Sequence, residues 1–348
     1  MIGLALSGGG VKGSYEVGAY MALKKCHIKP SVICGTSIGA FNGAMIASHR
    51  EKELLSFWRN AKFGNILGFS EEYVNKVNNK DFDIDFYKLS YNTLTKILKN
   101  KGIDSEEMLN TLKSFNIESR LRKSDINFGL CTYRLNDKSK IQLFINDIPE
   151  NKLDDYILAS CFLPVFQKRK LVDDGYYFDG GIYNNLPINM LLEAGCDKIY
   201  AIDLKAIGIK QKVAKEANVT YISPSRRTSS IISVDKEKIN NNLLLGYLDT
   251  LKVLNKLDGK TYFFKKYNEK FYDFLVRKIN LDELNRAKKL MHVNTNKDLV
   301  IKCLENLMKK NELDYLKIYN PIKIIKYFRK HKENTLSLEI IQKIKFVF

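Results

Sequence analysis

Short apolar segments alternate with amphipathic ones over the first fifty residues. Gly3–Ser7 and Ser31–Cys34 are apolar runs of strand length, and each is followed by a glycine-rich turn. Apolar residues within 11–23 and 40–48 then recur at helical spacing. Two successive strand–turn–helix units predict an α/β fold with a mostly parallel central sheet.

The middle of the chain predicts more elements of the same kind. Residues 51–121 have a mostly helical pattern with polar breaks. Beyond them, apolar runs bounded by turn residues indicate further strands, the first two forming a hairpin. The predicted strands are Ile126–Tyr133, Ile141–Ile145, Val172–Phe178 and Lys198–Leu204, and the predicted helices are Leu153–Cys161 and Leu186–Ala194.

The positive charge is concentrated towards the C-terminus. The chain has a formal net charge of +18, and residues 201–348 contain 31 Lys and Arg against 16 Asp and Glu. From Lys236 onward only helical patterns occur, so the step in charge coincides with a change of structure. We predict an α/β domain at 1–205, with a helical, lid-like insertion at 51–121, and a basic helical region at 206–348.

Simple counts disfavour several classes of protein. No stretch reaches the roughly 18 uninterrupted apolar residues of a membrane-spanning helix, and the first residues lack the basic leader of a signal peptide. The six cysteines form no C-x-x-C pair and the four histidines no H-E-x-x-H pattern. We therefore expect a cytoplasmic protein without a metal or a cofactor.

A G-x-S-x-G turn separates a predicted strand from a predicted helix. Gly35 and Gly39 flank Ser37 at two positions on either side. Small residues there leave room for a sharp turn that presents the hydroxyl above the N-terminus of the helix, where developing negative charge is favoured. This context favours Ser37 as a nucleophile over an ordinary tight turn.

The first glycine-rich turn is compatible with two functions. Gly8, Gly10 and Gly13 match the G-x-G-x-x-G dinucleotide fingerprint, which is usually accompanied by an acidic residue at the end of the second strand. That strand ends without one. The amides of Gly8, Gly9 and Gly10 can instead form an oxyanion hole facing Ser37, because both turns follow adjacent parallel strands. A nucleotide-dependent oxidoreductase remains the alternative.

A third turn offers a base for the serine. Asp179, Gly180 and Gly181 follow a predicted strand, although a D-G-G sequence alone is most often only a turn. None of the four histidines suits the role that histidine has in a Ser-His-Asp site. The remaining candidate for the base is an aspartate that acts directly on Ser37, and the glycines would permit its close approach.

Together these segments resemble the signature blocks of the patatin-like phospholipase family. The blocks are residues 6–13, 35–40 and 179–187, in the family's order and spacing. Ala159-Ser160 with Pro164 is similar to a helix-to-loop segment of that family. The resemblance covers about residues 1–205 and includes neither the helical segment 51–121 nor the region after 205.

The resemblance implies a three-layer α/β domain and a metal-free Ser-Asp dyad that cleaves ester bonds of phospholipids or neutral lipids, as a phospholipase A or a lysophospholipase does. Carried over, Ser37 is the nucleophile and Asp179 the general base. The amides of the Gly8–Gly10 turn form the oxyanion hole, with Lys12 beside it at the family's basic position. A catalytically silent binding module would need a broken dyad, and both residues are present.

The basic region suggests a membrane contact. Aromatic and aliphatic residues alternate with Lys and Arg in Tyr315–Lys332, as in an amphipathic helix that lies on an anionic, inner membrane face. The alternative, which we favour for this segment, is a packed helix with a solvated lysine face. Nucleic-acid binding is disfavoured because no recognised motif is present. The sequence does not predict an oligomeric state.

Overall fold

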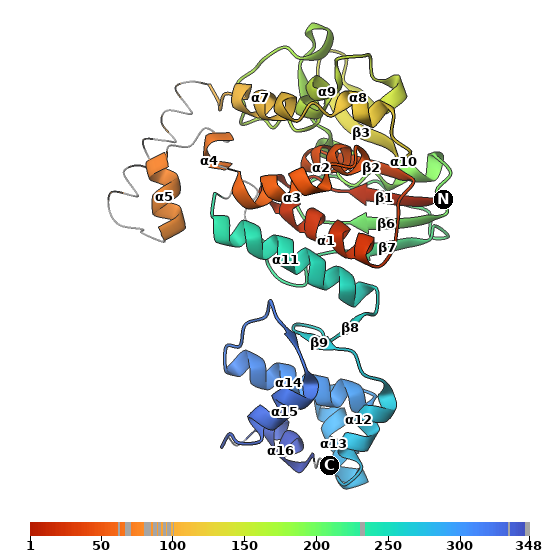
Figure 1. Ribbon diagram of the computed structural model, residues 1–348, viewed down its shortest axis with the longest axis vertical. Coiled ribbons are helices and arrows are strands. Elements are labelled where there is room, and N and C mark those ends of the chain that lie inside the picture. Colours follow the sequence, from red (N-terminus) through yellow and green to blue (C-terminus); the bar gives the residue numbers. More distant parts are fainter. Residues whose placement is uncertain are drawn as a thin grey trace. The chain divides into compact units, whose positions relative to one another are not determined.

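The computed structural model describes residues 1–61, 63–66, 71–79, 101–229, 234–332 and 335–344, and the single positions 85, 89, 92, 95 and 99. The chain divides into two compact units, Met1–Asp249 and Thr250–Phe348 (Figure 1). The first unit extends beyond the boundary expected at residue 205. It does so because a further strand joins the sheet and a long helix packs against the first helix.

The first unit is built around a seven-stranded, mostly parallel sheet. The strand order is β4-β3-β2-β1-β6-β7, with β5 paired to β3. Only β4 and β5 run antiparallel to β3, so the predicted parallel sheet and the predicted β3–β4 hairpin are both confirmed. The strands are β1 Ile2–Leu6, β2 Val32–Thr36, β3 Asn127–Arg134, β4 Ser139–Phe144, β5 Tyr177–Asp179, β6 Lys198–Ile202 and β7 Val219–Ile222.

The strand expected at Val172–Phe178 is shorter than predicted. Residues 172–174 form a 3-10 turn in which Asp173 and Asp174 have φ values of 48° and 54°. Such left-handed backbone cannot continue a strand, so β5 is confined to Tyr177–Asp179. The sequence analysis also did not predict β7.

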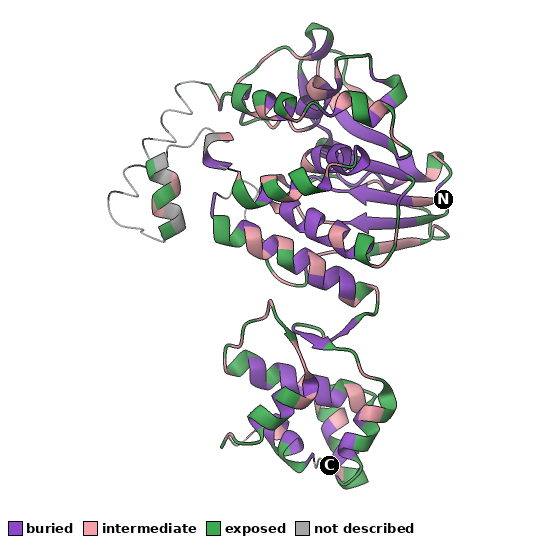
Figure 2. Cartoon of the chain, in the orientation of Figure 1, coloured by how far each residue is buried: buried purple, intermediate pink, exposed green. Residues whose placement is uncertain are grey.

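Helices cover both faces of the sheet, which gives three layers (Figure 1). Helices α2 (Ile38–Ala47) and α9 (Leu153–Ser160) pack on one face, and α10 (Ile188–Glu193) packs on the other. Leu6, Ile33 and Phe128 point towards α2, whereas alternate residues such as Cys34 and Ala201 share a core with α10. Figure 2 shows the strands buried between these layers, as the near-continuous apolar runs predict.

Helices α1 (Ser14–Lys25) and α11 (Lys236–Val253) cross at two glycines. A Cβ atom on Gly18 would collide with the Leu243 carbonyl, and one on Gly246 with the Tyr15 carbonyl. The Tyr15 hydroxyl also donates a hydrogen bond of 3.2 Å to Asp249 Oδ2. These contacts attach α11, as far as Asp249, to the first unit.

Most described residues of the expected insertion at 51–121 are helical, but residues 101–105 are not, and Ile103 among them forms an isolated β-bridge with Phe166. Position 62, positions 67–70 and most of 80–100 lie outside the described residues. The helices are α3 Glu51–Asn60, α4 Phe63–Ile66, α5 Glu71–Asn79, α7 Glu106–Phe115 and α8 Glu118–Arg122.

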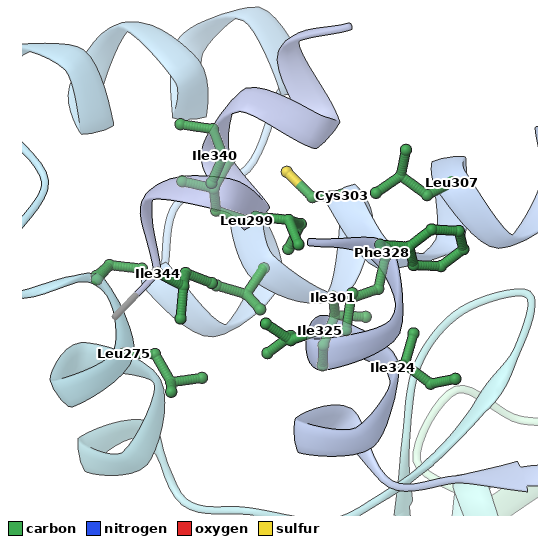
Figure 3. Packing of buried hydrophobic residues seen from close by; sticks show 14 of the residues in the cluster. Leu275, Leu299, Ile301, Cys303, Leu307, Ile324, Ile325, Phe328, Ile340 and Ile344 are labelled. Atoms are coloured by element: carbon green, nitrogen blue, oxygen red, sulfur yellow. The ribbon is translucent and has the colours of Figure 1, made fainter. Parts of the chain in front are cut away.

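The second unit consists mainly of helices around its own core. Leu299, Cys303, Ile325, Phe328 and Ile340 are fully buried there (Figure 3). Side-chain oxygens of Asn268, Asn280, Thr295, Asn320 and Thr335 cap the N-termini of its helices. The helices are α12 Glu269–Val276, α13 Leu281–Met291, α14 Asn296–Lys310, α15 Pro321–Phe328 and α16 Leu336–Lys343.

Two features of the second unit refine the sequence analysis. A small sheet of β8 (Leu257–Asp258), β9 (Phe263–Lys265) and β10 (Ile318–Tyr319) lies where only helices were expected. In the amphipathic segment, Ile325 and Phe328 of α15 are buried while its lysines are exposed. The favoured interpretation, a packed helix with a solvated lysine face, is confirmed.

Candidate active site

Strand β3 aligns the ends of two other strands. Along one edge it pairs with β4 over most of its length. Along its other edge, β2 occupies the first part, with Thr36 opposite Cys131, and β5 occupies the next part, with Asp179 opposite Thr132. Because β2 and β5 run in opposite directions, their C-terminal ends meet. The position after Thr36, which is Ser37, therefore lies beside Asp179.

The turn at Ser37 is strained in the way that a nucleophile elbow requires. Ser37 has φ 57° and ψ −128°, a conformation that is costly for a residue with a side chain. Gly35 and Gly39 have no room for a Cβ, since each would collide with backbone, Gly35 with Gly39 and Gly39 with Leu6. The two flanking glycines thus have the steric role that the sequence predicts.

Asp179 is buried next to the Ser37 side chain. Burial raises the pKa of its carboxyl from 3.8 to about 6, although hydrogen bonds from the Ser37 side chain and the Gly181 amide oppose the rise. The Gly181 amide donates to Asp179 Oδ1 at 2.8 Å. A Cβ on Gly180 would collide with the Cys131 carbonyl, so this glycine lets the turn lie close to β3.

Asn185 fixes the first glycine turn. Its carbonyl accepts a hydrogen bond from the Gly8 amide at 3.1 Å, and its side-chain amide donates to the Gly8 carbonyl at 3.4 Å. Within the described part of the chain, the amides of Gly9 and Gly10 have no such acceptor. Of the three amides expected to form an oxyanion hole, that of Gly8 already donates to Asn185 and so helps to position the turn. The amides of Gly9 and Gly10 remain available to donate to an oxyanion.

The sequence analysis assigned no individual role to Ser160 or Asn184, each of which makes a further contact at the site. The Ser37 amide donates to Ser160 Oγ at 2.8 Å, and the Ser160 hydroxyl in turn donates to the Cys131 carbonyl at 2.6 Å. Thr36 Oγ1 donates to the Asn184 carbonyl at 2.8 Å. Ser160 and Asn184 lie within the segments that carry the family resemblance, which is the only sequence signal for them.

Ser37 borders two cavities of different character. One, of about 510 Å³, is also lined by Gly9, Gly10, Asp179 and residues 207–209. The other, of about 90 Å³, is almost wholly apolar. Its walls come from α2, α3, α4, α7 and the segment after α9, and include Phe41, Phe57, Trp58, Phe63, Met108, Leu112 and Phe166.

Lys12 and Gly13 do not line the cavity that contains Asp179. Lys12 lines a separate, neighbouring cavity and not the one that holds Asp179. A Cβ on Gly13 would lie 2.6 Å from Ile38 Cγ1 and 3.0 Å from Trp58 Cζ2. Gly13 therefore permits close helix packing. In the described residues, His, Cys, Asp and Glu form no group that could hold a metal ion.

The fold and this arrangement define an α/β protein with a buried serine–aspartate pair at the carboxyl edge of a parallel sheet. The model of the patatin-like phospholipase family matches residues 4–192. The chain belongs to the patatin-like phospholipase family. The matched residues contain all three glycine turns, so we do not retain the dinucleotide-binding alternative.

Lysophospholipases are among the curated relatives that match part of the chain. Lysophospholipase nte1 of Aspergillus terreus is 28% identical over 216 residues, and that of Neurospora crassa is 25% identical over 210 residues. Each match covers 59% of this chain but only 12% of the relative. The chain thus corresponds to a small part of these much longer proteins.

Two solved structures are similar over nearly the whole chain. VipD from Legionella pneumophila aligns over 97% of this chain and 83% of its own, with a TM-score of 0.45 and 14% identity. The type III effector protein ExoU aligns over 98% and 72%, with a TM-score of 0.34 and 12% identity.

Proposed function

We propose that the protein is a lipid acyl hydrolase of the phospholipase A or lysophospholipase type, with Ser37 as nucleophile and Asp179 as general base. The observation that carries the proposal is the meeting of β2 and β5 on β3, which places a strained serine beside a buried carboxylate. Family membership and the names of the relatives support the reaction class.

In the first half-reaction, the Ser37 oxygen attacks the ester carbonyl while Asp179 accepts the hydroxyl proton. Negative charge develops on the former carbonyl oxygen, where the free amides of Gly9 and Gly10 donate hydrogen bonds. Collapse of this intermediate breaks the bond to the alcohol, which takes the proton from Asp179 and leaves. The acyl group remains esterified to Ser37.

Water completes the reaction. Asp179 takes one proton from a water molecule as its oxygen attacks the acyl-enzyme, and the same amides stabilise the second intermediate. When the intermediate collapses, Ser37 recovers its proton from Asp179 and the fatty acid is released. A carboxyl pKa raised by burial makes Asp179 a better base for both steps.

On this proposal, each of the two cavities binds a different part of the substrate. The apolar cavity accepts the start of the acyl chain, because its lining consists of aromatic and aliphatic side chains. The larger cavity beside Gly9 and Asp179 accepts the alcohol part. Helices of the 51–121 insertion supply part of the apolar wall, which supports its proposed lid-like role.

Substitution of each member of the dyad tests the mechanism. Ser37→Ala removes the nucleophile, so kcat/KM on a short-chain chromogenic ester should fall to background. Asp179→Asn removes the base and should lower it by about 10²–10⁴-fold. A fluorophosphonate should label the wild-type serine and not the Ser37→Ala variant.

Ser56→Ala is the matched control, since Ser56 is an exposed serine on α3. It should retain activity and labelling. Near wild-type turnover in either dyad variant would refute the mechanism.

We further propose peripheral contact with an anionic membrane at its cytoplasmic side, through the second unit. Residues 250–348 contain 23 Lys and Arg against 11 Asp and Glu. Leu281, Leu290 and Tyr327 are exposed large apolar side chains on these lysine-rich helices, a combination that suits a lipid interface. The free cysteines support a reducing compartment. Among the residues that the structure describes, we find no helix long and apolar enough to cross a bilayer.

A further inference from the structure

Asn42 lies on α2, five residues after Ser37, and its side chain is fully buried. The side-chain amide donates to the Gly13 carbonyl at 3.0 Å and to Glu16 Oε2 at 2.9 Å. Its Oδ1 accepts a hydrogen bond of 2.9 Å from Trp58 Nε1. A backbone carbonyl can only accept and an indole N–H can only donate, so these partners fix the direction of the amide. This one side chain therefore joins the first glycine turn, α1 and α3.

The first glycine turn is held at both of its ends. At one end the Gly8 amide donates to the Asn185 carbonyl, and at the other end the Gly13 carbonyl accepts from Asn42. Between these contacts lie the two amides proposed to stabilise the oxyanion. One of them belongs to Gly10, whose φ of 57° lies in the left-handed region. Because consecutive glycines leave a backbone much conformational freedom, the two contacts restrict the directions in which these amides point.

Trp58 connects the same network to the apolar cavity. Its ring stacks on Phe63, with ring centroids 5.0 Å apart, and meets Phe57 edge to face at 5.7 Å. All three rings line the cavity that we propose for the acyl chain. An acyl chain in that cavity therefore packs against the indole whose N–H donates to Asn42.

We propose that Asn42 is a positioning residue that links acyl-chain binding at Trp58 to the amides of the first glycine turn. The inference rests on the proposed function and deepens it, because it states how the acyl chain contributes to the rate. A chain that reaches Trp58 holds the indole N–H against Asn42 Oδ1, and the Asn42 amide then holds the Gly13 carbonyl.

Part of the binding energy of the acyl chain is thereby used to fix the amides that stabilise the transition state. Binding energy used in this way raises kcat. Contact with the apolar wall alone would stabilise the bound substrate and the transition state equally, and would only lower KM. The two parameters therefore distinguish a positioning role from simple binding.

The test compares an acetyl and an octanoyl ester of one chromogenic alcohol. In the wild type, kcat should be about tenfold higher on the octanoyl ester. Asn42→Leu keeps a side chain of similar size without hydrogen bonds, so kcat should become equal on the two esters within about twofold, while KM stays lower for the octanoyl ester. Trp58→Phe keeps an aromatic wall and removes the indole N–H, so it should have the same effect. This second variant decides the outcome where Asn42→Leu does not fold.

Ser48→Ala is the matched control. Ser48 is another buried polar residue, at the C-terminal end of α2, and its hydroxyl donates to the Met45 carbonyl at 3.0 Å. The ratio of kcat on the two esters should stay within about twofold of the wild-type value. Thermal unfolding and fluorophosphonate labelling of each variant show that it is folded and has a reactive Ser37.

Three results would overturn the inference. They are a wild type with equal kcat on both esters, an Asn42→Leu variant that loses kcat equally on both, as a purely structural role would give, and an unchanged kcat ratio in Trp58→Phe. A wild type that is inactive on both esters and is not labelled by the fluorophosphonate would instead refute the proposed function, and the inference with it.

Discussion

At Asp179, burial and hydrogen bonding act on the carboxyl in opposite directions. Desolvation raises its pKa, while the Ser37 side chain and the Gly181 amide favour the ionised form and limit the rise. The resulting pKa of about 6 keeps the group ionised near neutral pH, yet makes it more basic than an exposed aspartate. The same residue therefore affects both activity and stability.

The activity should depend on the ionised form of Asp179. Since only the carboxylate can accept the serine proton, kcat/KM on a short-chain ester should rise with pH through an apparent pKa near 6 and then level off. A pH–rate profile measured with a neutral ester checks this. A profile that stays flat to about pH 4.5 would show that Asp179 is not the base, or that its pKa is not raised.

The contribution of Asp179 to the free energy of unfolding should change with pH in the opposite direction to the activity. Because folding raises the pKa of Asp179 from 3.8 to about 6, the contribution of the protonated group is fully present below pH 3.8 and is lost as the pH rises through 6. Asp179→Asn cannot ionise, so it should increase the free energy of unfolding by about 3 kcal/mol above pH 7. Denaturant unfolding near pH 8 and near pH 4 measures the difference; an equal gain at both would contradict it.

The residue types at the site could be predicted from the sequence, but their contacts could not. Ser37 and Asp179 were expected to meet, and the structure brings them together. The Gly8 amide is already hydrogen-bonded to Asn185, and Lys12 lines a different cavity. Both contacts depend on the path of segments far away in the chain. No local pattern contains this information.

At the scale of elements, helices outside the sheet layers shape the apolar cavity. Phe57 and Trp58 come from α3, and Met108 and Leu112 come from α7. Residues four apart, such as Met108 and Leu112, lie on one face of α7, which here is the face that borders the cavity. The length of acyl chain that fits should therefore depend on α7.

A larger side chain on this face should shorten the preferred acyl chain. Met108→Trp fills part of the apolar cavity, so kcat/KM on a palmitoyl ester should fall at least about tenfold, while that on a butyryl ester should fall less than about threefold. A chain-length series of chromogenic esters measures the change. Glu107→Trp, at an exposed neighbouring position on α7, is the control; a uniform loss in Met108→Trp over the series would contradict the assignment.

The strands of the second unit that the sequence analysis missed have too few residues to show a period. The strands β8 and β10 have two residues each and β9 has three, whereas alternation needs about four or more to be recognised. The longer elements, such as β3 and α14, have clear patterns. In the case of β5, the left-handed residues Asp173 and Asp174 delay the start of a strand that the apolar pattern predicted from Val172.

At the scale of the whole molecule, most of the excess positive charge lies in one unit and the candidate active site in the other. The candidate active site belongs to Met1–Asp249, whereas residues 250–348 carry a net charge of +12. The charge step along the sequence was informative, but it did not give the boundary, because residues 206–249 are basic and still pack with the first unit.

The chain should bind anionic vesicles in a salt-dependent way. In flotation, it should move with vesicles that contain phosphatidylserine at low ionic strength and remain behind at about 0.5 M salt, since screening weakens such contacts. Replacing the exposed Lys289, Lys309 and Lys323 by Gln should weaken binding at least about tenfold.

The matched control replaces exposed lysines of the first unit, Lys138, Lys140 and Lys168, by Gln. Binding should then change less than about twofold. Equal flotation with neutral and anionic vesicles, or equal loss in the two triple variants, would contradict binding through the second unit.

The head-to-head meeting of β2 and β5 on β3 also has a consequence during synthesis. Ser37 leaves the ribosome long before Asp179, and the two become neighbours only when β5 pairs with the last residues of β3. An incomplete nascent chain therefore exposes its serine without a base. On the proposed mechanism, the host membrane is not at risk from unfinished copies of the enzyme.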